Sequence, residues 1–267
     1  MLHDQHLHTS YSGDSRADID KYYEITSRYN CKYFVSTDHI EFDSVYNGLD
    51  WTVDYPFLKE DLKRLHKEYP NVTPLLGVEI GYRKDKLKEM DNLLASQEFD
   101  LINLSVHDNG IYDYYMRNSF ETIGINRMLD IYFNNVIDAL NTYDNFDVLS
   151  HFDYGFKTAY LIDDTLDIEM YKTYVLEIFK KVIAKGKTLE INVKVQHTIN
   201  DDNHLKTWLK WYYDLGGVNI TLSSDSHEEQ SLIEYYDNQK HYFDIIKSCG
   251  FKMVVYFVKR QLYKCNI

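Results

Sequence analysis

Short hydrophobic runs alternate with amphipathic stretches along this chain, and the alternation predicts a strand followed by a helix about seven times. The hydrophobic runs predict strands over residues 1–8, 32–37, 72–80, 99–106, 146–150, 188–193, 218–223 and 251–258. Apolar residues spaced three or four apart predict a helix that opens at Pro56 and further helices over residues 18–30, 83–96, 125–143, 165–185, 202–215 and 228–248. This order indicates parallel strands with helices outside them.

Two stretches interrupt the alternation and carry many polar and aromatic side chains. Residues 41–55 and residues 108–122 are both predicted to be loops, and the second contains Asp108, Tyr112, Asp113, Tyr114, Tyr115 and Arg117. Long loops in compact domains often form lids or binding loops. We therefore expect the second loop to take part in binding.

The composition indicates one compact domain over residues 1–267. Hydrophobic residues make up 44% of the chain, which holds only three prolines and no linker rich in Pro, Gly and Ser. The 25 tyrosines and 13 phenylalanines predict a largely aromatic core.

The charge and the cysteines restrict the possible partners and compartments. A formal net charge of −13 argues against binding to long nucleic acids, whose phosphates need a basic surface. It leaves a small anionic substrate open, because bound divalent cations would be the largest local charges in such a site. Three unpatterned cysteines, no signal-peptide pattern and no apolar run of membrane-spanning length predict a cytoplasmic protein without a membrane partner.

The first predicted strand carries Asp4, His6 and His8, and the small polar loop after it contains Asp14. Side chains two positions apart on a strand point to the same face. Two imidazoles with a nearby carboxylate can bind zinc, iron or manganese. Asp4 lies on the same face, where it could orient an imidazole.

Further chemically active residues follow the carboxyl ends of other predicted strands. Together with the first group they are His6, His8, Asp14, His39, Glu79, His107, His151, Asp225 and His227. Singly, each has an ordinary explanation, such as a capped turn for His39 or a satisfied core histidine for His107. A barrel brings all these strand ends to one mouth, whereas an open sheet would separate its outer strands too far for one site. The joint pattern therefore favours a distorted barrel.

These residues resemble the motifs of the polymerase and histidinol phosphatase (PHP) family of metal-dependent phosphoesterases. The matching motifs are Asp4-x-His6-x-His8, Thr37-Asp38-His39, Gly77-Val78-Glu79, Ser105-Val106-His107, His151-Phe152-Asp153 and Ser224-Asp225-Ser226-His227. They occur in order over nearly the whole chain. The turn Ser12-Gly13-Asp14-Ser15, the sequence Leu189-Glu190-Ile191-Asn192 and the chain length are similar to the histidinol-phosphate phosphatase branch.

The resemblance implies a distorted (β/α)7 barrel with a trinuclear site for zinc, iron or manganese at the carboxyl ends of the strands. One metal would be held by His6, His8, Glu79 and Asp225, a second by Asp14, His39 and His227, and the third by Glu79, His107 and His151. Glu79 would thus bridge two metals. The implied nucleophile is a metal-activated water rather than a side chain. Asp4 and Asp38 are expected to support the ligands from behind.

The chain departs from the branch at two positions. Where the family shows an arginine a few residues after its His-Leu-Asp motif, this chain has Lys157, which lacks the bidentate fork of a guanidinium. Val193 follows Glu-Ile-Asn, where a small or hydroxylated residue is common. We predict that at least one of Lys157, Arg117 and Arg16 contacts phosphate, with Lys157 favoured.

The expected reaction is hydrolysis of a phosphate monoester, with L-histidinol phosphate of histidine biosynthesis as the first candidate substrate. A protein tyrosine phosphatase or a nucleotide-directed phosphoesterase of the same family is the alternative. A metal-binding scaffold without turnover is the non-enzymatic alternative, and the complete set of ligand types argues against it. The expected partner is a small phosphorylated molecule, and the expected assembly is a monomer or homodimer.

Overall fold

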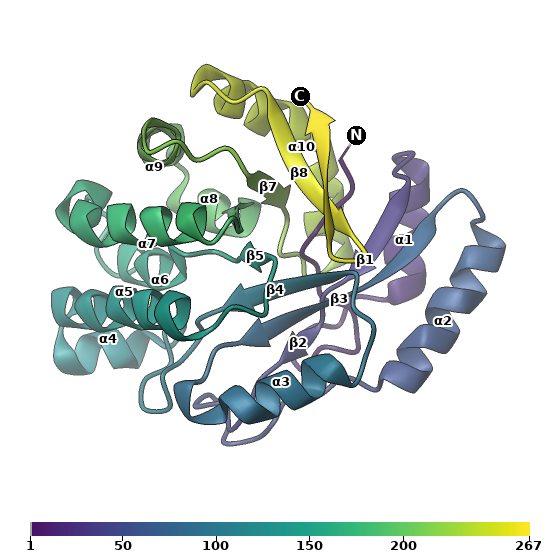
Figure 1. Ribbon diagram of the computed structural model, residues 1–267, viewed down its shortest axis with the longest axis horizontal. Coiled ribbons are helices and arrows are strands. Elements are labelled where there is room, and N and C mark those ends of the chain that lie inside the picture. Colours follow the sequence, from purple (N-terminus) through teal and green to yellow (C-terminus); the bar gives the residue numbers. More distant parts are fainter. Residues whose placement is uncertain (1) are drawn as a thin grey trace.

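The computed structural model describes residues 2–267, in which parallel strands curl into an open barrel with helices around it (Figure 1). The strands pair in the order β1-β3-β4-β5-β6-β7, and β2 pairs with β3. In chain order they are β1 (Tyr33–Ser36), β2 (His39–Ile40), β3 (Thr73–Gly81), β4 (Leu101–Ser105), β5 (Val148–Leu149), β6 (Thr188–Asn192) and β7 (Ile220–Ser223). The predicted distorted barrel of alternating strands and helices is confirmed.

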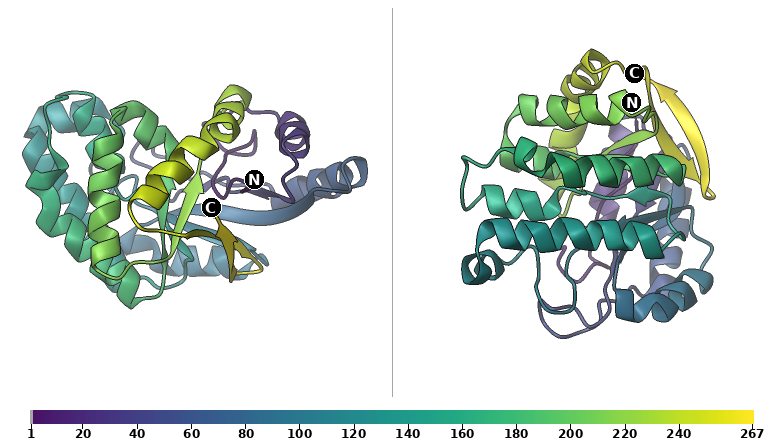
Figure 2. Two further views of the ribbon diagram at one scale, coloured as in Figure 1. Left: turned by 90° about the horizontal axis from the view of Figure 1, so that it is seen from above. Right: turned by 60° about the vertical axis from the view of Figure 1, so that its left-hand side comes forward.

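Helices cover the outer face of the sheet, as the two further views show (Figure 2). They are α1 (Ile19–Arg28), α2 (Tyr55–Glu68), α3 (Leu87–Ala95), α4 (Arg117–Ile123), α5 (Ile125–Thr142), α6 (Tyr154–Tyr160), α7 (Lys172–Ala184), α8 (Val193–Ile199), α9 (Asp202–Asp214) and α10 (Glu229–Ser248), with short 3-10 turns at Lys84–Lys86 and Ile168–Tyr171. No helix in the described part of the chain combines the length and apolar character that a membrane crossing requires.

Local sequence explains where several helices begin. Asp18 precedes α1, and its side chain accepts the Asp20 N–H. Asp54 likewise precedes α2 and accepts the Phe57 N–H, with a proline in the first turn. The short helices α4, α6 and α8 were not predicted, because each has only seven residues and too few turns to show a helical period. α4 occupies part of the loop expected over residues 108–122.

The strand predicted over residues 1–8 is not formed as a regular strand. Within its described part, Leu7 makes an isolated parallel bridge to Ser226. The Leu7 N–H donates to Thr37 Oγ1 over 2.9 Å, and the Thr37 N–H donates to Leu7 O over 3.1 Å. The His8 N–H donates to Ser226 O over 2.8 Å. The segment therefore links the carboxyl ends of β1 and β7 and closes that side of the barrel.

The chain ends in an antiparallel hairpin of β8 (Met253–Val258) and β9 (Gln261–Asn266). The hydrophobic run of β8 was predicted, but its antiparallel pairing and β9 were not. Val255 and Phe257 of β8 pack in an apolar cluster with Val35, Leu75, Leu101 and Val148, which lie on the parallel strands. The hairpin, yellow in Figure 1, thereby shields apolar side chains of the sheet.

The hairpin turn shows why the sequence pattern missed β9. Lys259 and Arg260 both have positive φ, at 51° and 60°, in place of the Asn-Gly pair that signals a tight hairpin. Their backbone N–H groups donate to Asp100, which holds the turn against the start of β4. These tertiary hydrogen bonds offset an unfavourable local conformation.

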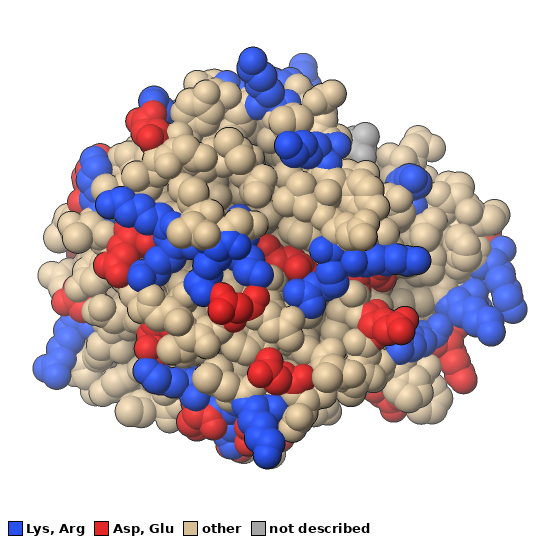
Figure 3. Space-filling model, in the orientation of Figure 1, with Lys and Arg blue, Asp and Glu red and all other residues tan. Residues whose placement is uncertain are grey.

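The charges on the face of Figure 1 are mixed. Figure 3 shows lysine and arginine side chains there interspersed with aspartate and glutamate. This face gives no continuous basic surface of the kind that nucleic-acid binding uses.

The closure by the N-terminal segment leads to a stability prediction. Thr37→Val removes the hydroxyl that accepts from the Leu7 N–H and donates to Leu7 O, and Leu7 is buried. We expect the free energy of unfolding to fall by about 1–3 kcal/mol, measured by urea denaturation of metal-free protein. Thr73→Val, at the exposed start of β3, is the control and should change it by less than about 0.5 kcal/mol. Equal effects of the two variants would contradict the closure.

Candidate metal centre

The barrel brings the predicted metal ligands together at the carboxyl ends of its strands. All nine lie there: His6, His8, Asp14, His39, Glu79, His107, His151, Asp225 and His227. Most are buried, while Asp14 and His227 reach the surface. The segments that carry them lie far apart in sequence, so tertiary folding alone assembles the cluster.

Glu79 lies at the centre of the cluster and is completely buried. Its Oε2 lies 2.8–3.3 Å from ring nitrogens of three histidines, His39, His6 and His8. Its Oε1 lies 2.8 Å from His151 Nε2 and 3.5 Å from His107 Nε2. One carboxylate thus faces two groups of imidazoles, which is the geometry of a bridging ligand.

Several buried atoms of this cluster make no contact of hydrogen-bond geometry within the described chain, although they lie close together. They include His6 Nε2, His8 Nε2, His39 Nδ1 and Glu79 Oε2. Buried polar atoms are nearly always satisfied, because leaving them unpaired costs free energy. These four point toward one another at short range, and imidazole nitrogen with carboxylate oxygen is a donor set that suits zinc, iron and manganese. The residues therefore fit bound metal ions.

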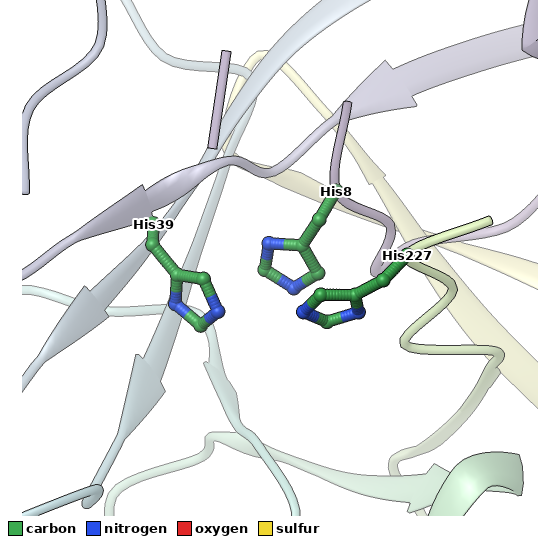
Figure 4. Close-up of side chains that lie close together, drawn as sticks. All are labelled: His8, His39 and His227. Carbon is green, nitrogen blue, oxygen red and sulfur yellow. The ribbon is translucent and has the colours of Figure 1, made fainter. Parts of the chain in front are cut away.

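A second part of the cluster lies nearer the surface. Figure 4 shows His8, His39 and His227 pointing their rings toward one another from three separate segments, and each offers a nitrogen within 4.8 Å of the others. Asp14 Oδ2 lies 3.0 Å from His227 Nε2 and 3.5 Å from His39 Nε2. This places Asp14, His39 and His227 around one position, as the resemblance implied.

Asp225 approaches the same rings from the end of β7. Its Oδ1 lies 3.4 Å from His8 Nε2 and 4.0 Å from His6 Nε2. Its φ of 55° is in the left-handed region, and its N–H donates to His6 O over 2.8 Å. A non-glycine residue held in that region is a local strain that functional sites commonly retain.

The electrostatic balance of the site favours ionised carboxylates. Burial by itself would raise the pKa of Glu79, but His6, His39 and His107 beside it lower that pKa well below its usual range. Burial also opposes ionisation of Asp14, whose pKa is nevertheless lowered by hydrogen bonds from His227 and His39. Both groups are therefore available as anionic ligands at neutral pH.

The two predicted supporting carboxylates hold the backbone rather than an imidazole. Asp4 Oδ1 accepts the N–H groups of His6 and Ser224, over 3.1 and 3.0 Å. Asp38 accepts the backbone and hydroxyl donors of Thr9. The expectation that Asp4 orients a ring is thus corrected, because its carboxylate accepts hydrogen bonds from the backbone of His6 and Ser224 instead.

Glu190 and Glu41 are the carboxylates that face imidazoles from behind. Glu190 Oε1 accepts from His6 Nδ1 over 2.7 Å, and Glu41 Oε1 accepts from His107 Nδ1 over 2.7 Å. Neither was predicted as a site residue. Glu190 gave a usable signal, since it is a charged residue inside an apolar strand, as Glu79 is.

A cavity of about 460 Å³ opens beside the cluster. Among its lining residues are His39, His107, His151, Asp225 and His227, together with Trp51, Asp113, Tyr115, Tyr154 and Lys157. Of the loop residues predicted to face a substrate, Asp113 and Tyr115 do so. Tyr114 is instead buried in the core, and Asp108 pairs with Arg83 over 3.3 Å.

The predicted phosphate contacts divide among three places. Lys157 is buried in the cavity wall, with its Nζ 4.2 Å from the ring centre of Tyr154. Arg16 lines an adjoining groove that shares Asp14, Asp225 and His227 with the cavity. Arg117 lies on the surface of α4 and pairs with Glu121 over 2.7 Å, so the structure does not bring it to the site.

Lys194 is a further cation at the mouth and was missed from the sequence. It is in the first turn of α8, and its Nζ lies 3.0 Å from His227 Nδ1 and 3.6 Å from Asp225 Oδ1. Its position directly after β6 is the only sequence signal, because a single lysine carries no motif.

The fold and the site match a known family. The model of the PHP domain family matches residues 4–194. This chain therefore belongs to the PHP family, which is the class that the barrel and its histidine and carboxylate cluster define.

Particular proteins are similar to most or nearly all of the chain. A protein of Clostridium acetobutylicum named probable histidinol-phosphatase is 26% identical over 97% of this chain and 98% of its own length. The histidinol-phosphatase of Lactococcus lactis subsp. lactis is 24% identical over 84% of this chain and 83% of its own. The crystal structure of the histidinol phosphate phosphatase from Lactococcus lactis subsp. lactis, complexed with zinc, L-histidinol and phosphate, superposes with a TM-score of 0.85. It covers 99% of this chain and 100% of its own at 22% identity, and this likeness supports the fold.

The central position of Glu79 can be tested by metal content. Because its two oxygens face separate groups of histidines, Glu79→Gln should reduce occupancy at two metal positions. His227→Ala, at the rim, should reduce occupancy mainly at one. Metal per chain, measured by elemental analysis after dialysis, distinguishes the two variants. Equal losses of a single metal would contradict the bridging role.

Proposed function

We propose that this protein hydrolyses L-histidinol phosphate to L-histidinol and phosphate with a centre of three metal ions. The observation that carries the proposal is the position of Glu79 between two groups of histidines inside a PHP-family barrel. The whole-length relatives named as histidinol-phosphatases support the choice of substrate. The reaction would belong to histidine biosynthesis in the cytoplasm, and the expected assembly remains a monomer or homodimer.

The proposed ligand sets are those that the family resemblance implies. One metal would be held by His6, His8, Glu79 and Asp225, a second by Asp14, His39 and His227, and the third by Glu79, His107 and His151. Zinc, iron and manganese all suit these donors, and the zinc in the Lactococcus lactis structure supports zinc as the first to test. Bound metals would supply positive charge for the phosphate oxygens and would lower the pKa of an attacking water.

The chain itself contributes two cations for the phosphate. Lys157 and Lys194 both line the cavity, and within residues 2–267 the Lys157 ammonium has no ion-pair partner. A phosphate monoester dianion placed between them would satisfy both charges. Burial, together with nearby Lys194, lowers the pKa of Lys157 to about 8, because a buried ammonium without an anion is costly.

The outer part of the cavity suits the histidinol group. Trp51 and Tyr115 offer aromatic faces, while Asp113 offers a buried carboxylate. An imidazole can stack on the aromatic faces, and an ammonium can pair with the carboxylate. A neutral or anionic leaving group would leave the negative charge of Asp113 without a cation.

Substrate choice tests this proposal directly. We expect kcat/KM for L-histidinol phosphate to exceed that for a phosphotyrosine peptide and for a simple phosphodiester by at least about tenfold, the effect of about 1.4 kcal/mol of added contacts. All three are measured on one zinc-loaded preparation at one pH. A faster reaction with the peptide would reject the substrate, and a faster reaction with the diester would reject the monoesterase.

Asp113→Asn is a matched variant for that comparison. Its amide oxygen can still accept the Tyr115 and Met116 N–H groups that order the loop, but the negative charge is lost. KM for L-histidinol phosphate should rise, while kinetics with p-nitrophenyl phosphate, which carries no cation, should stay the same.

The lowered pKa of Lys157 predicts a pH dependence. Its ammonium is charged below about pH 8 and neutral above it, so kcat/KM should fall as the pH rises through about 8. Lys157→Arg keeps the charge and should remove this decline. Lys157→Met should lose about 1.5–3 kcal/mol of transition-state binding at pH 7, seen in kcat/KM. Arg117→Ala, on the surface of α4, is the control. An unaltered alkaline decline in Lys157→Arg would exclude Lys157 as its cause.

A further inference from the structure

Glu41 is a buried carboxylate that joins the metal centre to the wall of the cavity. It follows β2 directly and opens the rim loop, residues 41–54, and it is only 5% exposed. Its Oε1 lies 2.7 Å from His107 Nδ1 and 3.6 Å from His39 Nδ1. Because a carboxylate only accepts hydrogen bonds, the short contact makes His107 Nδ1 the donor. His107 Nε2 is then left facing Glu79, 3.5 Å away.

Gly81 at the end of β3 provides the space for this carboxylate. A Cβ added at Gly81 would lie 2.5 Å from Glu41 Cδ and 2.7 Å from Glu41 Oε1, so the carboxylate would have to move away. The φ of Gly81 is outside the left-handed region, so its backbone conformation does not call for glycine. Because Gly81 has no side chain, the Glu41 carboxylate can occupy this space beside the metal centre.

The backbone of Glu41 is paired as firmly as its side chain. Its N–H donates to Trp51 O over 3.1 Å, and the Trp51 N–H donates to Glu41 O over 2.9 Å. The Trp51 ring lies edge-on to His39, with 5.6 Å between ring centres. Glu41 thus holds the His107 imidazole with its side chain and holds Trp51, which lines the cavity, with its main chain.

The opposite side of the centre has the same arrangement. Glu190 accepts from His6 Nδ1 over 2.7 Å and turns His6 Nε2 toward Glu79. Carboxylates behind metal-binding imidazoles fix the ring orientation and increase the basicity of the ligand nitrogen. Two glutamates from distant elements, Glu41 and Glu190, therefore flank Glu79 in equivalent roles.

We propose that Glu41 is a positioning residue that fixes His107 for metal binding and that Gly81 is a glycine because the Glu41 carboxylate occupies its side-chain space. The inference rests on the metal centre of the proposed function but not on its substrate. Glu41 acts through His107 and touches neither the phosphate nor the reacting atoms.

Metal binding tests the role without any substrate. Metal-free wild type and variants are titrated with zinc in a chelator-buffered series, and zinc per chain is measured. Glu41→Ala should bind one zinc per chain about 10- to 100-fold more weakly. Glu41→Gln keeps an oxygen that can accept from His107 Nδ1 and should bind nearly as wild type. Gly81→Ala should reproduce the weakness of Glu41→Ala, because its methyl group displaces the carboxylate.

A double-mutant cycle shows whether Glu41 acts through His107. In the His107→Ala background, Glu41→Ala should add no further loss, because the group that it positions is absent. Additive losses would overturn the proposal, and so would wild-type zinc affinity in Glu41→Ala.

Asn47→Ala controls for order in the rim loop. Asn47 accepts from Leu49 N and from the Trp51 side chain, so its loss loosens the same loop without touching His107. It should keep wild-type zinc affinity, and a loss equal to that of Glu41→Ala would also overturn the proposal. If Gly81→Ala does not fold, the comparison of Glu41→Ala with Glu41→Gln still decides. A protein that shows these zinc effects but does not hydrolyse L-histidinol phosphate would retain the role of Glu41 and reject the substrate alone.

Discussion

The buried charge of Glu79 is the constraint on which the arrangement of the mouth depends. A carboxylate with no exposure to water is costly unless cations or donors surround it. Here five histidines from four separate segments supply ring nitrogens around its two oxygens. Without cations, several of those nitrogens remain unsatisfied. The site is therefore a preassembled cluster of donor atoms that suits metal ions.

The barrel makes this cage possible because parallel strands all end on the same side. β3 provides Glu79, β2 provides His39, and the segments after β4, β5 and β7 provide three further imidazoles and Asp225. The N-terminal segment contributes His6 and His8 although it is no regular strand, since its hydrogen bonds to Thr37 and Ser226 fix its path. The contacts that close the barrel therefore also bring His6 and His8 to the site.

Around the cage, the chain builds two further shells with separate tasks. Glu41 and Glu190 lie behind the imidazoles and set their orientation, while Asp4 and Asp38 hold the backbone turns that carry them. The cavity wall then adds Lys157 and Lys194 together with aromatic and acidic groups. The proposed contacts to metal, phosphate and leaving group thus use different residues and can be altered separately.

The sequence by itself determined the alternation of strands and helices and the positions of the metal-ligand candidates. Both are local properties: hydrophobic periodicity marks a strand, and a histidine or carboxylate directly after it must lie at the strand's carboxyl end. Because parallel strands run in one direction, His39, Glu79 and His107 are expected at the same end of the barrel before any contact is known.

Only the tertiary structure decided the features that depend on long-range pairing. Residues 2–8 replace a strand because β1 and β7 leave a gap that they fill, and β9 forms because Asp100 holds a hairpin turn with no turn-forming sequence. Glu41 and Lys194 reach the site through contacts with residues distant in sequence, whereas Arg117 lies on the exposed surface of α4, where it pairs with Glu121. Local sequence determines which functional groups lie at the end of each strand. The contacts of each side chain depend on packing between segments that are distant in sequence, so only the tertiary structure decides them.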